Sequence, residues 1–129
     1  MAVLLYFILP LTKATVLFYD THLAGELVHF ERVINGTLPE LPEDEIKSSG
    51  YVVDTLEAAT WCLLNYANFK DTLLTAVNLG EDTDTVGAVT GGLAGVYYGY
   101  SNIPEEWLTE IKILEDIRTL CDQFVIHIE

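Results

Sequence analysis

Two carboxylates and a hydroxyl lie close together in the second half of the chain. The sequence GEDTDT over residues 80–85 places Asp82, Asp84 and Thr85 within four positions. Carboxylate and hydroxyl oxygens are the hard ligands that Mg²⁺, Mn²⁺ and Ca²⁺ prefer. Side chains two residues apart diverge on a helix, but they converge in an irregular turn that leads into one. The spacing therefore indicates a divalent-metal site. A helix cap, in which Asp82 or Thr83 accepts from free backbone N–H groups, is the alternative.

The same string also fits the Asp-x-Asp-x-(Thr/Val) pattern of haloacid-dehalogenase-type phosphatases. In those enzymes the first aspartate follows a buried strand. Residues 75–80 here continue a helical pattern, so this class of phosphatase is excluded.

The segments that must position these residues are predicted to be helices. Apolar residues recur at helical spacing over residues 53–66, 69–79 and 83–98, and Gly80 stands where a helix commonly ends. An amphipathic segment over 21–34 precedes a loop over 37–50, which holds two prolines and several acids. A last helix is expected after Pro104, with an inner face made of Trp107, Ile111, Leu114, Ile117, Cys121 and Phe124. No segment alternates with period two, so the predicted fold class is all-α.

Glycine recurs every fourth residue along the third of these helices, at Gly87, Gly91, Gly95 and Gly99. Glycine inside a helix costs about 1 kcal/mol relative to alanine, so such a row needs a compensating gain. Close packing against neighbouring backbones supplies it. We therefore expect this helix to be buried at the centre of a compact helical bundle, in preference to a membrane helix, because acids lie just upstream of it.

Charge and cysteine content narrow the classes of function. The 129 residues include 20 acidic and 6 basic side chains, a formal net charge of −14. A surface this negative repels phosphate backbones, which excludes nucleic-acid binding. Cys62 and Cys121 form no CxxC or Cys/His cluster, so a structural zinc site has no ligands. Both are expected to be buried, which fits a reducing, cytoplasmic compartment, although a disulfide between them stays open.

The first 19 residues form an almost uninterrupted apolar segment. Pro10 and Lys13 interrupt it before it reaches the length of a membrane span, and neither a basic start nor a clear cleavage site marks a signal peptide. We expect this segment to be buried within the protein. Anchoring of a small membrane-associated protein by residues 1–19 is the alternative.

Several motifs occur in order along the chain: SGYVVDTLEAA over residues 49–59, AVNLG over 76–80, DTDTVGA over 82–88 and IPEEW over 103–107. Together they resemble the ADP-ribosylglycohydrolase family over about residues 48–120. The resemblance implies an all-α orthogonal bundle with a two-metal centre that holds Mg²⁺ or Mn²⁺. It also implies hydrolysis that releases ADP-ribose from modified protein side chains or small molecules.

The resemblance also assigns roles to individual residues. By position, Asp82, Asp84 and Thr85 resemble the family's carboxy-terminal metal ligands. A second segment, Ser49, Gly50 and Tyr51, resembles the lining of the ADP-ribose pocket, with the tyrosine at the adenosine end. For Tyr51, a tyrosine that merely opens a helix is the alternative.

The sequence also departs from the family's pattern. The Gly-Asp-Ala loop and the Thr-Asp-Asp cluster, which supply the other half of the family's metal site, have no counterpart here. We treat residues 1–129 as one domain, in which 1–47 match poorly and 48–129 resemble the family's carboxy-terminal region. The chain is thus expected to be truncated relative to the family and to keep half of the two-metal site.

Two functions follow as alternatives: a hydrolase-type chain with a partial site, or a non-catalytic remnant or subunit that binds ADP-ribose weakly or serves assembly. The expected partners are ADP-ribosylated substrates, with a homo-oligomer or a separate amino-terminal half covering exposed apolar surface.

Overall fold

The computed structural model describes residues 24–128, and these residues are helical with no β-strand among them. The all-α prediction is therefore confirmed. The α-helices are α2 (Glu31–Ile34), α3 (Val52–Asn65), α4 (Phe69–Asn78), α5 (Thr83–Tyr98), α6 (Glu105–Leu108) and α7 (Leu114–Ile128). Short 3₁₀ segments complete the described chain: η2 (Ala24–Phe30), η3 (Leu38–Glu40), η4 (Glu43–Glu45) and η5 (Tyr100–Asn102).

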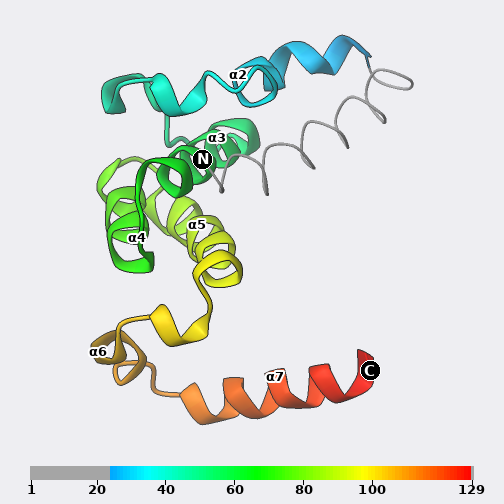
Figure 1. Cartoon of the computed structure of the whole chain (residues 1–129), viewed down its shortest axis with the longest axis vertical. Helices are drawn as coiled ribbons and strands as arrows, with labels where there is room; N and C mark the ends of the chain where they lie inside the picture. The colour runs from blue at the N-terminus through cyan, green and yellow to red at the C-terminus, as the bar shows by residue number, and fades with distance from the viewer. Residues whose placement is uncertain (1–23, 129) are drawn as a thin grey trace.

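Helices α3, α4 and α5 pack against one another and form the centre of the molecule (Figure 1). Small side chains make the close approach possible, since Ala58, Ala59, Ala76 and Ala94 are all fully buried. The segment before α3 crosses its outer face and adds Val33, Leu38 and Ile46 to the same apolar core. The helix that carries the aspartates is therefore held by two others along its length.

The boundaries of α3, α4 and α5 agree with the predicted ranges to within one residue, and those of α4 are set by local chemistry. Asn68 caps α4, with its side-chain oxygen accepting from the Asp71 amide at 2.9 Å. Gly80 follows Leu79, the capping residue at the end of α4. Its φ of +92° is the left-handed conformation predicted for a glycine that ends a helix. The amphipathic segment over 21–34 is different: within the described residues it is a 3₁₀ helix followed by the short helix α2.

The row of glycines on α5 packs less closely than predicted. A Cβ added at Gly87 would lie 3.0 Å from Val77 Cγ1, whereas one added at Gly95 would have no neighbour within 4 Å among the described residues. The buried face of α5 is formed by Val86, Thr90 and Ala94, and the opposite face includes Val96, which is 83% exposed. The expectation of a fully enclosed helix is thus wrong for the described part of the chain.

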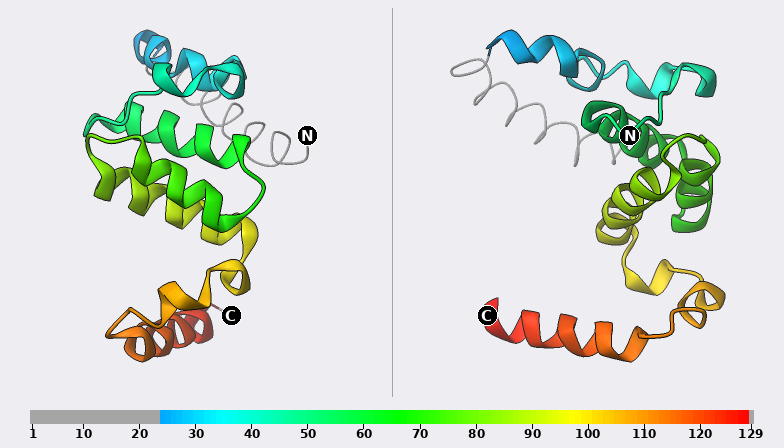
Figure 2. Two further views of the ribbon diagram at one scale, coloured as in Figure 1. Left: turned by 90° about the vertical axis from the view of Figure 1, so that its left-hand side faces the viewer. Right: turned by 180° about the vertical axis from the view of Figure 1, so that it is seen from behind.

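The predicted last helix is two helices. Residues 109–113 separate α6 from α7, and the Thr109 hydroxyl donates to the Glu106 carbonyl at the end of α6. Helix α7 lies apart from α3, α4 and α5 (Figure 2). Of the predicted inner face, Trp107 on α6 packs beside Phe69 with ring centroids 6.3 Å apart, whereas the part on α7 is largely exposed, with Phe124 65% exposed.

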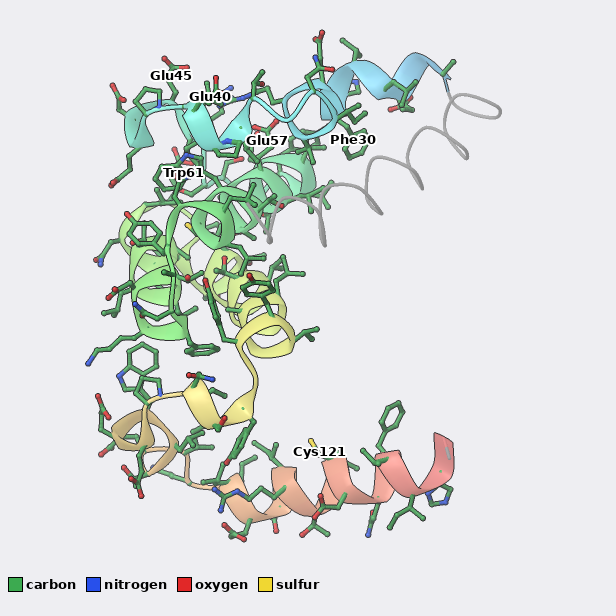
Figure 3. All side chains as sticks on the ribbon, in the orientation of Figure 1. Phe30, Glu40, Glu45, Glu57, Trp61 and Cys121 are labelled. Atoms are coloured by element: carbon green, nitrogen blue, oxygen red, sulfur yellow. The ribbon has the colours of Figure 1, made fainter. Side chains whose placement is uncertain are left out.

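The two cysteines differ in environment and are not joined. Cys62 is fully buried in α3, and this burial raises the pKa of its thiol to about 12. Cys121 lies on α7, on the side that faces the rest of the molecule (Figure 3), and it is exposed. The prediction that both cysteines are buried was wrong for Cys121, because the contact of α7 with η5, made by Arg118 and the Tyr100 hydroxyl, leaves Cys121 exposed. Within residues 24–128 no helix is both long and apolar enough to cross a membrane. The apolar residues 1–19 lie outside the described residues.

Candidate metal centre and its flanking loop

A sharp backbone corner places Asp82 at the start of α5. Gly80 and Glu81 are consecutive residues with positive φ, +92° and +51°. A left-handed conformation costs a non-glycine residue roughly 1–2 kcal/mol, so Glu81 is strained. Asp82 then precedes the first helical residue, but its side chain makes no capping hydrogen bond. The helix-cap alternative therefore does not account for this carboxylate.

Asp84 lies in the first turn of α5, where its carboxylate is hydrogen-bonded on two sides. A side-chain hydrogen bond with Asp82, followed by the Thr85 backbone amide, lowers the pKa of Asp84. The Thr85 amide donates to Asp84 Oδ1 at 2.9 Å. The two aspartates thus form a pair at the surface, with the exposed side chain of Thr85 beside them on the chain.

The loop before α3 docks directly on this pair. The Asp82 amide donates to the Ser48 carbonyl at 3.0 Å, and the Ser48 hydroxyl donates to the Gly80 carbonyl at 3.0 Å. A Cβ added at Gly50 would lie 2.9 Å from Asp82 Oδ2, so only glycine leaves the carboxylate this close to the backbone. The structure therefore brings together the two groups of predicted site residues, which are about 30 positions apart in the sequence.

The side chains of this loop differ in what they can offer a ligand. The Ser49 hydroxyl donates to Asp54 Oδ2 at 2.5 Å and accepts from the Tyr51 amide at 3.2 Å, so it is used within the loop. Thr55 completes the turn by donating its hydroxyl to the Ser49 carbonyl at 3.3 Å. Tyr51 is 51% exposed at the beginning of α3. Of the predicted lining, Gly50 and Tyr51 face outward, and Ser49 shapes the turn.

The residues at this corner fit a divalent cation in chemistry. Two carboxylates and one hydroxyl are hard oxygen donors, and the Asp82 carboxylate has no capping role that a metal would disturb. The described residues contain no cluster of three or more His, Cys, Asp or Glu side chains suited to a metal. The pair thus offers a partial ligand set, which water and substrate oxygens would complete.

Sequence reasoning missed three residues that build the site. Ser48, 2% exposed, joins the loop to the corner, and Asp54 fixes the Ser49 hydroxyl. Glu57, 6% exposed, forms an ion pair with Arg32 at 3.4 Å. For Asp54 there was a weak local signal in the sequence, because Ser49 lies five residues before it at the start of a helix. Neither of the others left a signal in the sequence.

Comparison with known proteins bears on the family of this chain. Residues 11–129 match the family model described as ADP-ribosylglycohydrolase. The chain is 53% identical over 88 residues to the ADP-ribosylarginine hydrolase Tri1 of Serratia proteamaculans, a match that covers 68% of this chain and 24% of that protein. It is 40% identical over 78 residues to the ADP-ribosyl-[dinitrogen reductase] glycohydrolase of Rhodospirillum rubrum, covering 59% and 26%. With human ADP-ribosylhydrolase ARH3 it shares 40% identity over 42 residues, covering 33% and 12%. The chain thus aligns with 26% or less of the length of each of these relatives.

Proposed function

The chain belongs to the ADP-ribosylglycohydrolase family, and on that premise we propose that it supplies one half of a metal-dependent site that releases ADP-ribose from modified side chains. ADP-ribosylated arginine is the first substrate to test, because the relative with 53% identity is named as an ADP-ribosylarginine hydrolase. One observation carries the proposal: the Ser49–Tyr51 turn packs against Asp82, so the candidate substrate segment and the candidate metal ligands form one surface.

In this proposal Asp82, Asp84 and Thr85 hold one Mg²⁺ or Mn²⁺ ion. A bound ion of this kind polarises substrate oxygens and lowers the pKa of a coordinated water. The lowered pKa of Asp84 keeps its carboxylate ionised at neutral pH, so it can act as a ligand without first losing a proton. The strained corner at Glu81 turns the Asp82 carboxylate toward Gly50 and away from the helix amides.

The same proposal assigns substrate contact to the outward face of the turn. Tyr51 offers an exposed aromatic ring, on which a purine can stack. Gly50 adds no side chain, which lets a ligand approach both the backbone and the aspartate pair. Ser49 keeps its hydroxyl on Asp54 and so holds the ring and the carboxylates in a fixed relation.

A two-ion reaction needs both ions and the substrate in register. The described residues offer one aspartate pair, so we expect this chain alone to bind metal and ADP-ribose weakly and to release no ADP-ribose from ADP-ribosylarginine. Turnover that disappears in Asp84→Ala would contradict this expectation. It would mean that the remaining ligands come from this chain or from a second copy.

The metal site is tested by titrating the full chain with Mn²⁺ and following free Mn²⁺ by electron paramagnetic resonance. We expect weak binding that falls at least about tenfold in the double variant Asp82→Ala/Asp84→Ala. The charge-matched control is Asp116→Ala/Asp122→Ala, which removes two exposed acids from α7 and should bind like the wild type. Equal Mn²⁺ affinity in all three proteins would refute the assignment.

The substrate segment is tested separately, by calorimetric titration with ADP-ribose with and without Mn²⁺. Binding should strengthen with the metal and weaken in Tyr51→Ala. Tyr100→Ala, which removes a similarly exposed tyrosine (52%) beyond α5, is the control and should bind normally. Loss of binding in the control alone would place the ligand elsewhere.

A further inference from the structure

Arg32 lies between a buried carboxylate and a loop carbonyl, at a distance in sequence from the metal centre. Its Nη1 atom lies 3.4 Å from Glu57 Oε2 on α3, and its Nη2 atom donates to the Glu45 carbonyl at 3.2 Å. Figure 3 shows Glu45 on the segment that crosses over α3 and Glu57 on the helix beneath it. The guanidinium has the planar, forked geometry that such a double contact requires.

The segment that Arg32 contacts leads directly to the aspartate pair. We call residues 41–48 the strap. Trp61 Nε1 donates to the Leu41 carbonyl at 3.0 Å at the start of the strap, and Ile46 is buried near its end. Ser48, its last residue, makes both hydrogen bonds to the corner at Gly80 and Asp82. The Arg32 contact at Glu45 is thus three residues from the point at which the strap holds the metal centre.

Burial opposes ionisation of Glu57, and Arg32 is the strongest of the charges that favour it. Burial raises the pKa of Glu57, Asp54 raises it further, and Arg32 and Lys47 lower it. Asp54 is the residue that fixes the Ser49 hydroxyl, and it lies one helical turn before Glu57. Removing Arg32 would leave a buried carboxylate beside a second acid, which is far more costly than losing an exposed pair.

We propose that Arg32 is a positioning residue for the candidate metal centre: by joining Glu57 to the strap, it holds Ser48 and Gly50 against Asp82. This inference rests on the proposed function for its metal readout, but its structural part is independent of any metal. Its alternative is that burial of Ile46 alone holds the strap and that Arg32 adds only general stability.

Hydrogen exchange separates these two roles, because the Asp82 amide is bonded to Ser48 in the strap. In Arg32→Gln we expect the Asp82 amide to exchange about tenfold faster. The amide of Gly99, bonded to Gly95 at the far end of α5, is the internal reference and should be unchanged. The control variant Lys70→Gln breaks the exposed ion pair with Glu106 and should leave both amides as in the wild type.

Two further variants keep the test decisive. Arg32→Lys retains the positive charge but not the two forked donors of the guanidinium. Its Asp82 amide should therefore be better protected than in Arg32→Gln but less protected than in the wild type. Glu57→Gln removes the carboxylate that anchors the guanidinium without opening a cavity. It should also speed exchange of the Asp82 amide, so it serves as the test if the Arg32→Gln variant does not fold. Mn²⁺ affinity should fall in the same order as protection of the Asp82 amide.

Two results would overturn the inference: normal exchange at Asp82 in both Arg32→Gln and Glu57→Gln, or an equal acceleration at Asp82 and Gly99. A wild-type chain that binds no Mn²⁺ would instead refute the proposed function. Selective exchange at Asp82 in that case would still support positioning of the strap by Arg32.

Discussion

Replacing Gly50 with alanine is the sharpest test of the contact between the turn and the candidate metal ligands. The new Cβ would lie 2.9 Å from Asp82 Oδ2, and ordinary contact begins near 3.4 Å. The carboxylate must therefore rotate away by roughly half an ångström, which exceeds the tolerance of about 0.2 Å on a metal–ligand distance. We expect Mn²⁺ affinity to fall about tenfold, or about 1.4 kcal/mol.

The same substitution should leave the fold nearly as stable as before. Gly50 is not among the glycines with positive φ, so alanine fits its backbone conformation. Alanine also reduces the conformational entropy of the unfolded chain, which should stabilise the folded protein by about 0.4–1 kcal/mol. Rotating the Asp82 side chain away from its preferred rotamer should destabilise the folded protein by about 0.5–1.5 kcal/mol. These terms nearly cancel, and the thermal midpoint should shift little.

The assay is Mn²⁺ titration of Gly50→Ala beside Gly92→Ala, whose added Cβ meets nothing within 4 Å among the described residues. The control should bind Mn²⁺ like the wild type and be slightly more stable, because alanine favours helix. Unchanged Mn²⁺ affinity in Gly50→Ala would show that the position of Asp82 does not matter to the metal, and the reasoning would fail.

Three more predictions concern stability. Among the described residues the buried hydroxyl of Thr90 has no hydrogen-bond partner, so Thr90→Val should raise the free energy of unfolding by about 1 kcal/mol in a denaturant titration. Burial raises the pKa of Glu57 above its usual 4.5, so the folded protein loses stability relative to the unfolded chain as pH rises through that raised pKa. Glutamine does not titrate, so the thermal midpoint of Glu57→Gln relative to the wild type should increase from pH 4 to pH 7. Gly87→Leu should destabilise by about 1–3 kcal/mol because its Cβ meets Val77 at 3.0 Å, whereas Gly95→Leu should cost little; equal midpoints for the two would contradict this packing.

Local sequence was enough to predict the three central helices. Asn68 and Gly80 begin and end α4, and both act through their own side chain or backbone conformation. Burial on α7 was not predictable in this way. Its apolar stripe is real, but whether a stripe is covered depends on which segments pack there, and among the described residues none covers Cys121 or Phe124.

In the candidate site too, residues that are neighbours in sequence were predictable, whereas contacts between distant residues were not. Asp82, Asp84 and Thr85 are near neighbours in sequence, so spacing alone was enough to propose them as metal ligands. The contact between Gly50 and Asp82 joins residues 32 positions apart, and it depends on how the chain returns after two helices. The family resemblance named both segments, but only the structure places one against the other. The Arg32–Glu57 pair spans a similar separation and has no motif to mark it.

The corner at Gly80 and Glu81 explains why the strap and the aspartate pair form one unit. Glu81 is held in a left-handed conformation that an isolated turn would relax. The two hydrogen bonds of Ser48, to the Gly80 carbonyl and from the Asp82 amide, flank this residue and offset its strain. If the strap lifts, both bonds are lost together and the corner can relax, which would turn the Asp82 carboxylate away from Asp84. If the proposed metal site is right, metal affinity should therefore depend on residues that do not touch the metal, among them Arg32.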